Sequence, residues 1–168
     1  GDEVLLLEPF WGSYDAAVRW VGAEPVRVAP RVDLGPDLDA IAAAARGAKG
    51  IMLNSPTNPS GFVWSDEELR GILAIAEEHD LWVISDEIYR RLTYGERPAT
   101  SPLSLGEGAR ERVLAVDGAS KSLAKTGFRI GCVIGPEAHV RALTNIQSET
   151  AGCPHALSQD AWSTRPLY

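Results

Sequence analysis

The residues of this sequence that could carry out chemistry gather in a few short stretches. Lys121 lies in DGASKS, and Arg129 follows it by eight positions. Asp86 and Tyr89 lie in SDEIYRRL, and Asn58 lies in NSPTNPSG. A primary amine held near an acid and an aromatic ring can form a Schiff base with a carbonyl compound. These residue types therefore indicate lysine-based covalent chemistry.

Each of these residues also has an ordinary structural explanation. Asp86 could cap the segment EIYRRL, Lys121 could be a solvated surface lysine, and Asn58 could shape a turn. Trp11, in EPFWGSY, could belong to the core. What distinguishes these residues is a shared position, because each stretch follows an apolar run that has the character of a buried strand.

One cofactor uses these residue types together. Pyridoxal 5′-phosphate needs a lysine for its Schiff base, an acid that keeps its pyridine nitrogen protonated, and donors for its phenolic oxygen. Its phosphate needs hydroxyls, amides and cations. The residues of this sequence match these needs, so this cofactor is our working hypothesis. We expect no metal site, because the histidines and cysteines lack metal-ligand spacing.

The elements that must position these residues alternate between short apolar runs and helical patterns. We expect strands at 4–7, around 26–28, and at 51–53, 81–84, 113–116 and 129–134. We expect helices at 13–22, 36–45, 65–80 and 136–150, and a loop at 95–110. The helix at 65–80 has the clearest start, because Ser65 and Glu68 have the spacing of a capping box.

This alternation predicts βαβ units, and hence a three-layer α/β/α fold with a mostly parallel sheet covered on both faces. In such folds, ligands bind beyond the carboxyl ends of the strands. The stretches EPFWGSY, NSPTNPSG, SDEIYRRL and DGASKS each follow a predicted strand. We therefore expect all four to face one crevice.

Composition narrows the class of protein. The chain has 168 residues, of which 45% are hydrophobic, and this is enough for one domain with a real core. A net charge of −7 argues against a nucleic-acid partner. No apolar run has the length of a membrane span, so we expect no membrane partner. With only two cysteines and no signal-peptide pattern at the start, we expect a reduced, cytoplasmic protein.

Three of these stretches together resemble a known family. NSPTNPSG, SDEIYRRLTY and SKSLAKTGFRIG, the last followed by GP, resemble the class I/II aminotransferases, which are fold-type I pyridoxal-phosphate enzymes. Their order, spacing and strand contexts all match, from Gly1 to about Trp162. The pairing of DEIY with SK and TG.R.G is the specific part of the resemblance, whereas NP.G alone would be weak.

The resemblance implies a catalytic role for three residues. Lys121 is similar to the lysine that forms the Schiff base and then shuttles the proton of the substrate α-carbon. Asp86 is similar to the acid that pairs with the pyridine nitrogen. Tyr89 and Asn58 are similar to the two groups that bond the phenolic oxygen. The implied catalytic set is Lys121, Asp86 and Tyr89.

The resemblance also implies further cofactor contacts. Ser120 and Arg129 are similar to the family's phosphate ligands, and Trp11 is similar to the aromatic residue that stacks on the ring. We expect Gly127 to let the chain turn so that Arg129 points back at the phosphate. Gly118 is a departure, because some members of the family have a phosphate-binding serine there.

By the same resemblance, residues 1–168 are part of the family's large, cofactor-binding domain, incomplete at both ends and without the small domain. One phosphate-binding turn would lie upstream of Gly1. The arginine that grips the substrate carboxylate would lie after Tyr168. The family builds its site at a dimer interface, so we expect the longer parent protein to be a homodimer.

Several functions remain open at this point. The first is transamination between an amino acid and a 2-oxo acid. The second is another fold-type I reaction with the same cofactor, as in a C–S lyase or a decarboxylase. The third is a ligand-sensing domain of a regulator, and the fourth is an inactive truncated fragment. The sequence does not identify the amino-acid substrate.

Overall fold

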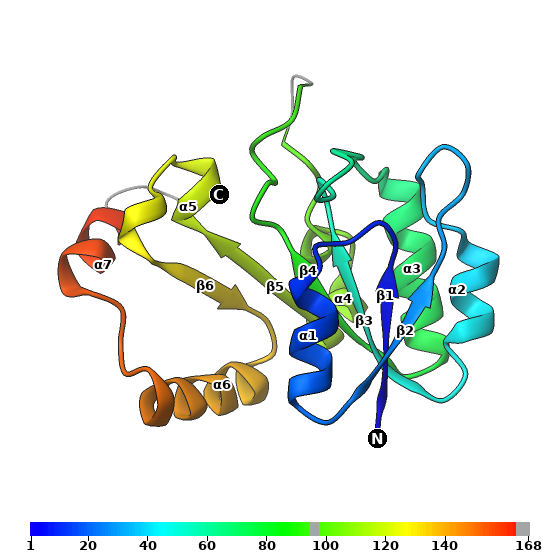
Figure 1. Ribbon diagram of the computed structural model, residues 1–168, viewed down its shortest axis with the longest axis horizontal. Coiled ribbons are helices and arrows are strands. Elements are labelled where there is room, and N and C mark those ends of the chain that lie inside the picture. The colour runs from blue at the N-terminus through cyan, green and yellow to red at the C-terminus, as the bar shows by residue number, and fades with distance from the viewer. Residues whose placement is uncertain (95–97, 164–168) are drawn as a thin grey trace.

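The protein is a three-layer α/β/α domain built on one six-stranded sheet (Figure 1). The computed structural model describes residues 1–94 and 98–163. Along the sheet the strands run in the order β2-β1-β3-β4-β5-β6, in which the first five are parallel and β6 is antiparallel to β5. Their bounds are β1 Glu3–Leu7, β2 Glu24–Val28, β3 Ala48–Asn54, β4 Trp82–Asp86, β5 Val113–Gly118 and β6 Gly131–Ile134.

Helices connect these strands in the rhythm that the sequence predicts. The α-helices are α1 Ser13–Trp20, α2 Leu38–Ala44, α3 Asp66–Glu78, α4 Glu107–Arg112, α5 Ala119–Ser122, α6 Glu137–Thr150 and α7 Ala156–Ser163. Two 3₁₀ helices lie at Pro102–Ser104 and Thr126–Phe128. The predicted capping box is present at α3, where the side chains of Ser65 and Glu68 each accept from the other's backbone N–H.

Successive residues of a strand point to opposite faces, and this divides the core in two. Leu5 and Leu7 of β1 pack with residues of α2 and α3 in a cluster of 16 buried side chains. Leu6 faces the other way and packs with Tyr14 and Val18 of α1. Figure 1 shows α1 on one side of β1 and the α2–α3 pair on the other. The predicted three-layer, mostly parallel architecture is thus confirmed.

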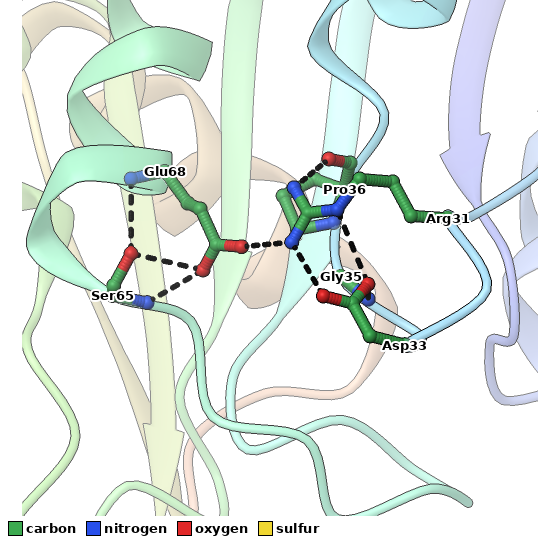
Figure 2. Close-up of polar contacts among 6 residues, drawn as sticks. All are labelled: Arg31, Asp33, Gly35, Pro36, Ser65 and Glu68. Carbon is green, nitrogen blue, oxygen red and sulfur yellow. Dashed lines mark hydrogen bonds and ion pairs between the residues drawn. The ribbon is translucent and has the colours of Figure 1, made fainter.

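A polar network joins the loop between β2 and α2 to the start of α3 (Figure 2). The Arg31 guanidinium donates to Asp33 at 3.0 Å, to Glu68 at 2.8 Å and to the Pro36 carbonyl oxygen at 2.7 Å. The hydrogen bond from Arg31 lowers the pKa of the Asp33 carboxyl below its usual value. This network holds the loop against α3, on the side of the sheet away from α1.

The prediction of a loop at 95–110 was wrong. The predicted loop at 95–110 contains the 3₁₀ helix Pro102–Ser104 and most of α4, while residues 95–97 lie outside the described part of the chain. Ala109 is the buried anchor of α4, whose acidic start and basic end suit the helix dipole. This helix was not predicted because two glycines, Gly106 and Gly108, flank its start.

The last strand and the first helix are also shorter than predicted. β6 begins at Gly131 because Arg129 has a left-handed backbone, with φ of 47°, which cannot continue a strand. α1 ends at Trp20, and Gly22 with φ of 80° makes the turn that follows. Among the helices of residues 1–94 and 98–163, none combines the length and the apolar character needed to cross a bilayer.

Candidate active site

A cavity of about 440 Å³ lies at the carboxyl ends of the strands, where α/β sheets bind ligands. All seven of the residues that the sequence predicted for the site line it, namely Trp11, Asn58, Asp86, Tyr89, Ser120, Lys121 and Arg129. The parallel strands explain this gathering, because they bring segments that are far apart in sequence to the same edge of the sheet. The predicted crevice is therefore present.

Asp86 ends β4, and hydrogen bonds hold its carboxylate in place. The Tyr14 hydroxyl donates to Oδ2 at 2.5 Å, and the Ile88 backbone N–H donates to Oδ1 at 3.1 Å. The Asn54 side chain donates to the Asp86 carbonyl oxygen at 2.8 Å and so ties β3 to β4 at this edge. Asp86 therefore does not serve as a free surface acid, because side-chain and backbone donors from two elements position it.

Asn58 and Tyr89 lie together on the same wall of the cavity. The Asn58 backbone N–H donates to Asn54 Oδ1 at 2.8 Å, which anchors the turn after β3. The Asn58 side-chain amide lies 3.4 Å from the Tyr89 hydroxyl, a long hydrogen bond. Two donor groups that close together can serve a single acceptor oxygen on a ligand.

Lys121 lies on α5, a four-residue helix that follows β5 directly. Its side chain is exposed to the cavity, and Nζ lies 5.7 Å from the centre of the Tyr89 ring. The neighbouring Ser122 hydroxyl donates to the Ile88 carbonyl oxygen at 3.3 Å, which joins α5 to the turn after β4. The lysine amine thus faces the wall that carries Asp86 and Tyr89.

Left-handed residues make the turn that brings Arg129 to the cavity. Ala124 and Arg129 have φ of 52° and 47°. Gly127 has no positive φ, and nothing lies within 4 Å of where a side chain would begin. The expectation that Gly127 supplies the turn is therefore wrong. Non-glycine residues seldom adopt this conformation, so their positions could not be recognised from the sequence.

Gly118 is a departure from the family pattern that the structure explains. A Cβ atom at this position would lie 2.8 Å from Ile88 Cδ1 and 3.3 Å from the Ile130 carbonyl oxygen. The Ile88 side chain, which comes from the turn after β4, therefore occupies the space beside Gly118. Ser120, two residues later, lines the cavity instead.

Tyr14 is the residue of this site that the sequence analysis missed. It lies one helical turn after Trp11, is only 6% exposed, and its ring meets the Trp11 ring edge-on at 5.7 Å. Burial raises the pKa of the Tyr14 phenol, and the neighbouring Asp86 charge raises it further. The phenol therefore stays protonated and donates throughout the ordinary pH range. The spacing of Trp11 and Tyr14 in EPFWGSY was the only signal for it.

The residue after Asp86 is a buried acid that lies behind the site. Glu87 is 2% exposed, and its Oε1 accepts from the Ser101 hydroxyl at 2.6 Å and from the Ser85 hydroxyl at 3.2 Å. Burial raises the pKa of this carboxyl, while the two hydroxyls and Arg90 oppose the shift. Glu87 thus anchors the turn that carries Asp86 and Tyr89. Among the described residues, no group of three or more His, Cys, Asp or Glu could hold a metal ion.

Comparisons with known proteins agree with this geometry. Residues 1–163 match the family model described as aminotransferase class I and II. The chain is 39% identical over 167 residues to a probable aspartate/prephenate aminotransferase of Thermus aquaticus, and 35% identical over 162 residues to an aspartate aminotransferase of Bacillus subtilis. These matches cover 98% and 94% of this chain, but 42% and 41% of the relatives.

Solved structures give the same result. The aspartate aminotransferase of Thermus thermophilus with maleate superimposes with a TM-score of 0.90 at 36% identity. The match covers 98% of this chain and 42% of that protein. The aromatic aminotransferase of Pyrococcus horikoshii superimposes with a TM-score of 0.89 at 33% identity, over 95% of this chain and 43% of that protein. The chain thus spans less than half the length of these relatives.

Proposed function

The chain belongs to the class I and II aminotransferase family, and on that premise we propose that it is part of the large, cofactor-binding domain of a pyridoxal-phosphate-dependent aminotransferase. The observation that carries the proposal is the cavity in which the acid Asp86, the amide and phenol of Asn58 and Tyr89, a lysine and an arginine come together. The remaining portion of the site would come from segments outside these 168 residues and from a second subunit of a cytoplasmic homodimer.

The donor set fits pyridoxal 5′-phosphate. When bound, this cofactor supplies a carbonyl carbon that condenses with primary amines and a protonated ring that withdraws electrons from the substrate α-carbon. The chain offers a carboxylate, an amide next to a phenol, and a hydroxyl with a guanidinium, which match a ring nitrogen, a phenolic oxygen and a phosphate. Lys121 offers the primary amine.

The polar residues of the wall that carries Asp86 would bind and orient the ring. Asp86 would hold a proton at the pyridine nitrogen, since its carboxylate is already fixed by Tyr14 and Ile88. Tyr89 and Asn58 would donate to the phenolic oxygen, which agrees with the 3.4 Å between their polar atoms. Trp11 is 52% exposed at the cavity and would exclude water from one face of the ring.

The residues after β5 would hold the phosphate and move the proton. The Ser120 hydroxyl and the Arg129 guanidinium would bind the phosphate oxygens, for which Arg129 would exchange its present hydrogen bond to the Thr126 carbonyl oxygen. Once the substrate has replaced it on the cofactor, the Lys121 amine would take the proton from the substrate α-carbon and deliver it to the cofactor. A general base needs this kind of direct reach to the proton it moves.

The substrates we propose are an amino acid and a 2-oxo acid, with aspartate as the first amino donor to test. Two of the relatives that cover most of this chain are named for aspartate, one of them also for prephenate. The lyase, decarboxylase and regulator hypotheses lose support, because each of these relatives is named an aminotransferase.

The test is an absorbance titration of the chain with pyridoxal 5′-phosphate. The wild type should develop a saturable visible band, and Lys121→Ala should lose it. Lys125→Ala is the matched control, because Lys125 lies in the same turn but its amine lies over the Phe128 ring. A band of the same size in Lys121→Ala, or no band in a folded wild-type chain, would overturn the proposal for this chain.

A further inference from the structure

The contact between Tyr14 and Asp86 joins two elements that are distant in sequence. Tyr14 comes from α1 and Asp86 from the end of β4, 72 residues apart. The Tyr14 ring is held by Leu6 and Val18 in the smaller part of the core and stacks on Phe10 at 6.5 Å. This packing fixes the ring, so that the position of the hydroxyl is set before any ligand arrives.

The hydrogen bonds to Asp86 fix the orientation of its carboxylate. Oδ2 receives the Tyr14 hydroxyl and Oδ1 receives the Ile88 N–H. Both neighbours are donors, which suits a carboxylate that only accepts. Each oxygen can accept a second hydrogen bond, so the carboxylate keeps capacity toward the cavity. A rotation of the carboxylate about its bond would break both existing contacts.

We propose that Tyr14 is a positioning residue whose hydroxyl holds the Asp86 carboxylate in the orientation that pairs it with a protonated ring nitrogen in the cavity. This inference rests on the proposed function. Tyr14 suits the task because its phenol remains a donor, as burial and the Asp86 charge both raise its pKa.

The same turn of chain also places the aromatic residue of the cavity. The Tyr14 backbone N–H donates to the Trp11 carbonyl oxygen at 3.0 Å, and the two rings meet edge-on. Tyr14→Phe removes only the hydroxyl and keeps the ring that supports Trp11. This substitution therefore separates the hydrogen bond to Asp86 from the packing of α1.

The first experiment measures the protonation state of the cofactor's ring nitrogen. Pyridoxal 5′-phosphate that carries ¹⁵N in its ring is added to the wild type, to Tyr14→Phe and to a control, Tyr94→Phe. The control changes a fully exposed tyrosine. In Tyr14→Phe the ¹⁵N shift should move toward the unprotonated value, and the dissociation constant should rise roughly tenfold or more. Tyr94→Phe should match the wild type. An unchanged ¹⁵N shift in Tyr14→Phe would overturn the proposal.

The second experiment needs no cofactor and follows tyrosine ionisation by absorbance. Up to about pH 11, where ordinary tyrosines ionise, Tyr14→Phe should lose no ionisation signal relative to wild type, because burial and the Asp86 charge raise the pKa of Tyr14. Asp86→Asn should let Tyr14 ionise at lower pH than in the wild type. Circular dichroism at each pH shows that the chain is still folded.

The two experiments separate the inference from the proposed function. If the wild type takes up no cofactor but the cofactor-free titration behaves as expected, the proposed function fails for this chain while the Tyr14–Asp86 contact stands. If Tyr14→Phe loses one tyrosine's worth of signal below about pH 11, Tyr14 is not held by Asp86 and the inference fails, whatever the cofactor does.

Discussion

The two walls of the cavity are built in different ways. The acid wall, which consists of Tyr14, Asn58, Asp86 and Tyr89, comes from segments next to β1, β3 and β4, in the middle of the sheet. The lysine wall, which consists of Ser120, Lys121 and Arg129, comes from short helices between β5 and the edge strand β6. The acid wall is cross-linked by side-chain hydrogen bonds, whereas Arg129 in the lysine wall donates to the carbonyl oxygen of Thr126, three residues before it.

The difference follows from how much of each wall rests on the core. Residues of β1, β3 and β4 belong to the large hydrophobic cluster, and Tyr14 is itself buried. Further along the chain, neither the strand β6 nor the helix α6 contains a buried residue. In Figure 1, α6 and α7 lie beside β6, at the opposite end of the molecule from α2. The acid wall therefore rests directly on the core, whereas the lysine wall is supported mainly by its own backbone.

The largest expected effect is a difference in stability between variants of the two walls. Asp86→Ala leaves the buried Tyr14 hydroxyl and the Ile88 N–H without their acceptor, and should lower the free energy of unfolding by about 2–3 kcal/mol. Lys121→Ala removes an exposed side chain and should change it by less than about 0.5 kcal/mol. Urea denaturation of both variants measures this. Equal losses of stability would show that the two walls do not differ.

A smaller effect is the contribution of Glu87, which lies behind the acid wall, to the pH dependence of the free energy of unfolding. Burial raises the pKa of Glu87 in the folded chain above the unfolded value, so the folded state binds its proton more tightly. The stability that this proton contributes is present below the unfolded pKa and is lost as pH rises through the folded pKa. One such group changes the free energy of unfolding by at most about 1.4 kcal/mol per pH unit.

Glu87→Gln should remove this contribution, because an amide keeps the acceptor oxygen for Ser85 and Ser101 but does not ionise. The fall in unfolding free energy with rising pH, measured by denaturant titration at a series of pH values above 4.5, should become shallower. It should not vanish, because burial also raises the pKa of Asp117. Glu67→Gln, on the exposed side of α3, is the control, and an identical change there would contradict the assignment to Glu87.

The smallest expected effect lies in the turn between Lys121 and Arg129 of the lysine wall, and it has the opposite sign. Ala124, two residues after the end of α5, has a left-handed φ of 52°, which costs an alanine about 1–2 kcal/mol and glycine little. Ala124→Gly should stabilise the chain by about 0.5–1 kcal/mol after the entropy cost of glycine. Ala142→Gly, in the exposed middle of α6, should instead destabilise it by up to about 1 kcal/mol. Thermal unfolding of both variants distinguishes these signs, and destabilisation by Ala124→Gly would contradict the strained turn.

The sequence predicted the location of the site better than its local shape. Asp86 and Lys121 could be placed because each follows an apolar run, and parallel strands bring such exits to one edge. Tyr14 could not be identified as a partner of Asp86, since nothing local marks a contact across 72 residues. α4 was missed because glycines flank its start, and its anchor, Ala109, is a buried residue that resembles any other alanine.

By itself, the sequence determined the six strands, the main helices between them, their order, and the chemistry available at the strand exits, because periodicity, capping and residue type are local properties. The tertiary structure alone decided which donors hold the Asp86 carboxylate, that Ala124 and Arg129 rather than Gly127 shape the turn after Lys121, and that Ile88 takes the space beside Gly118. These features depend on packing between segments that are far apart in the chain. Close packing leaves one arrangement for each, and no local pattern encodes which one.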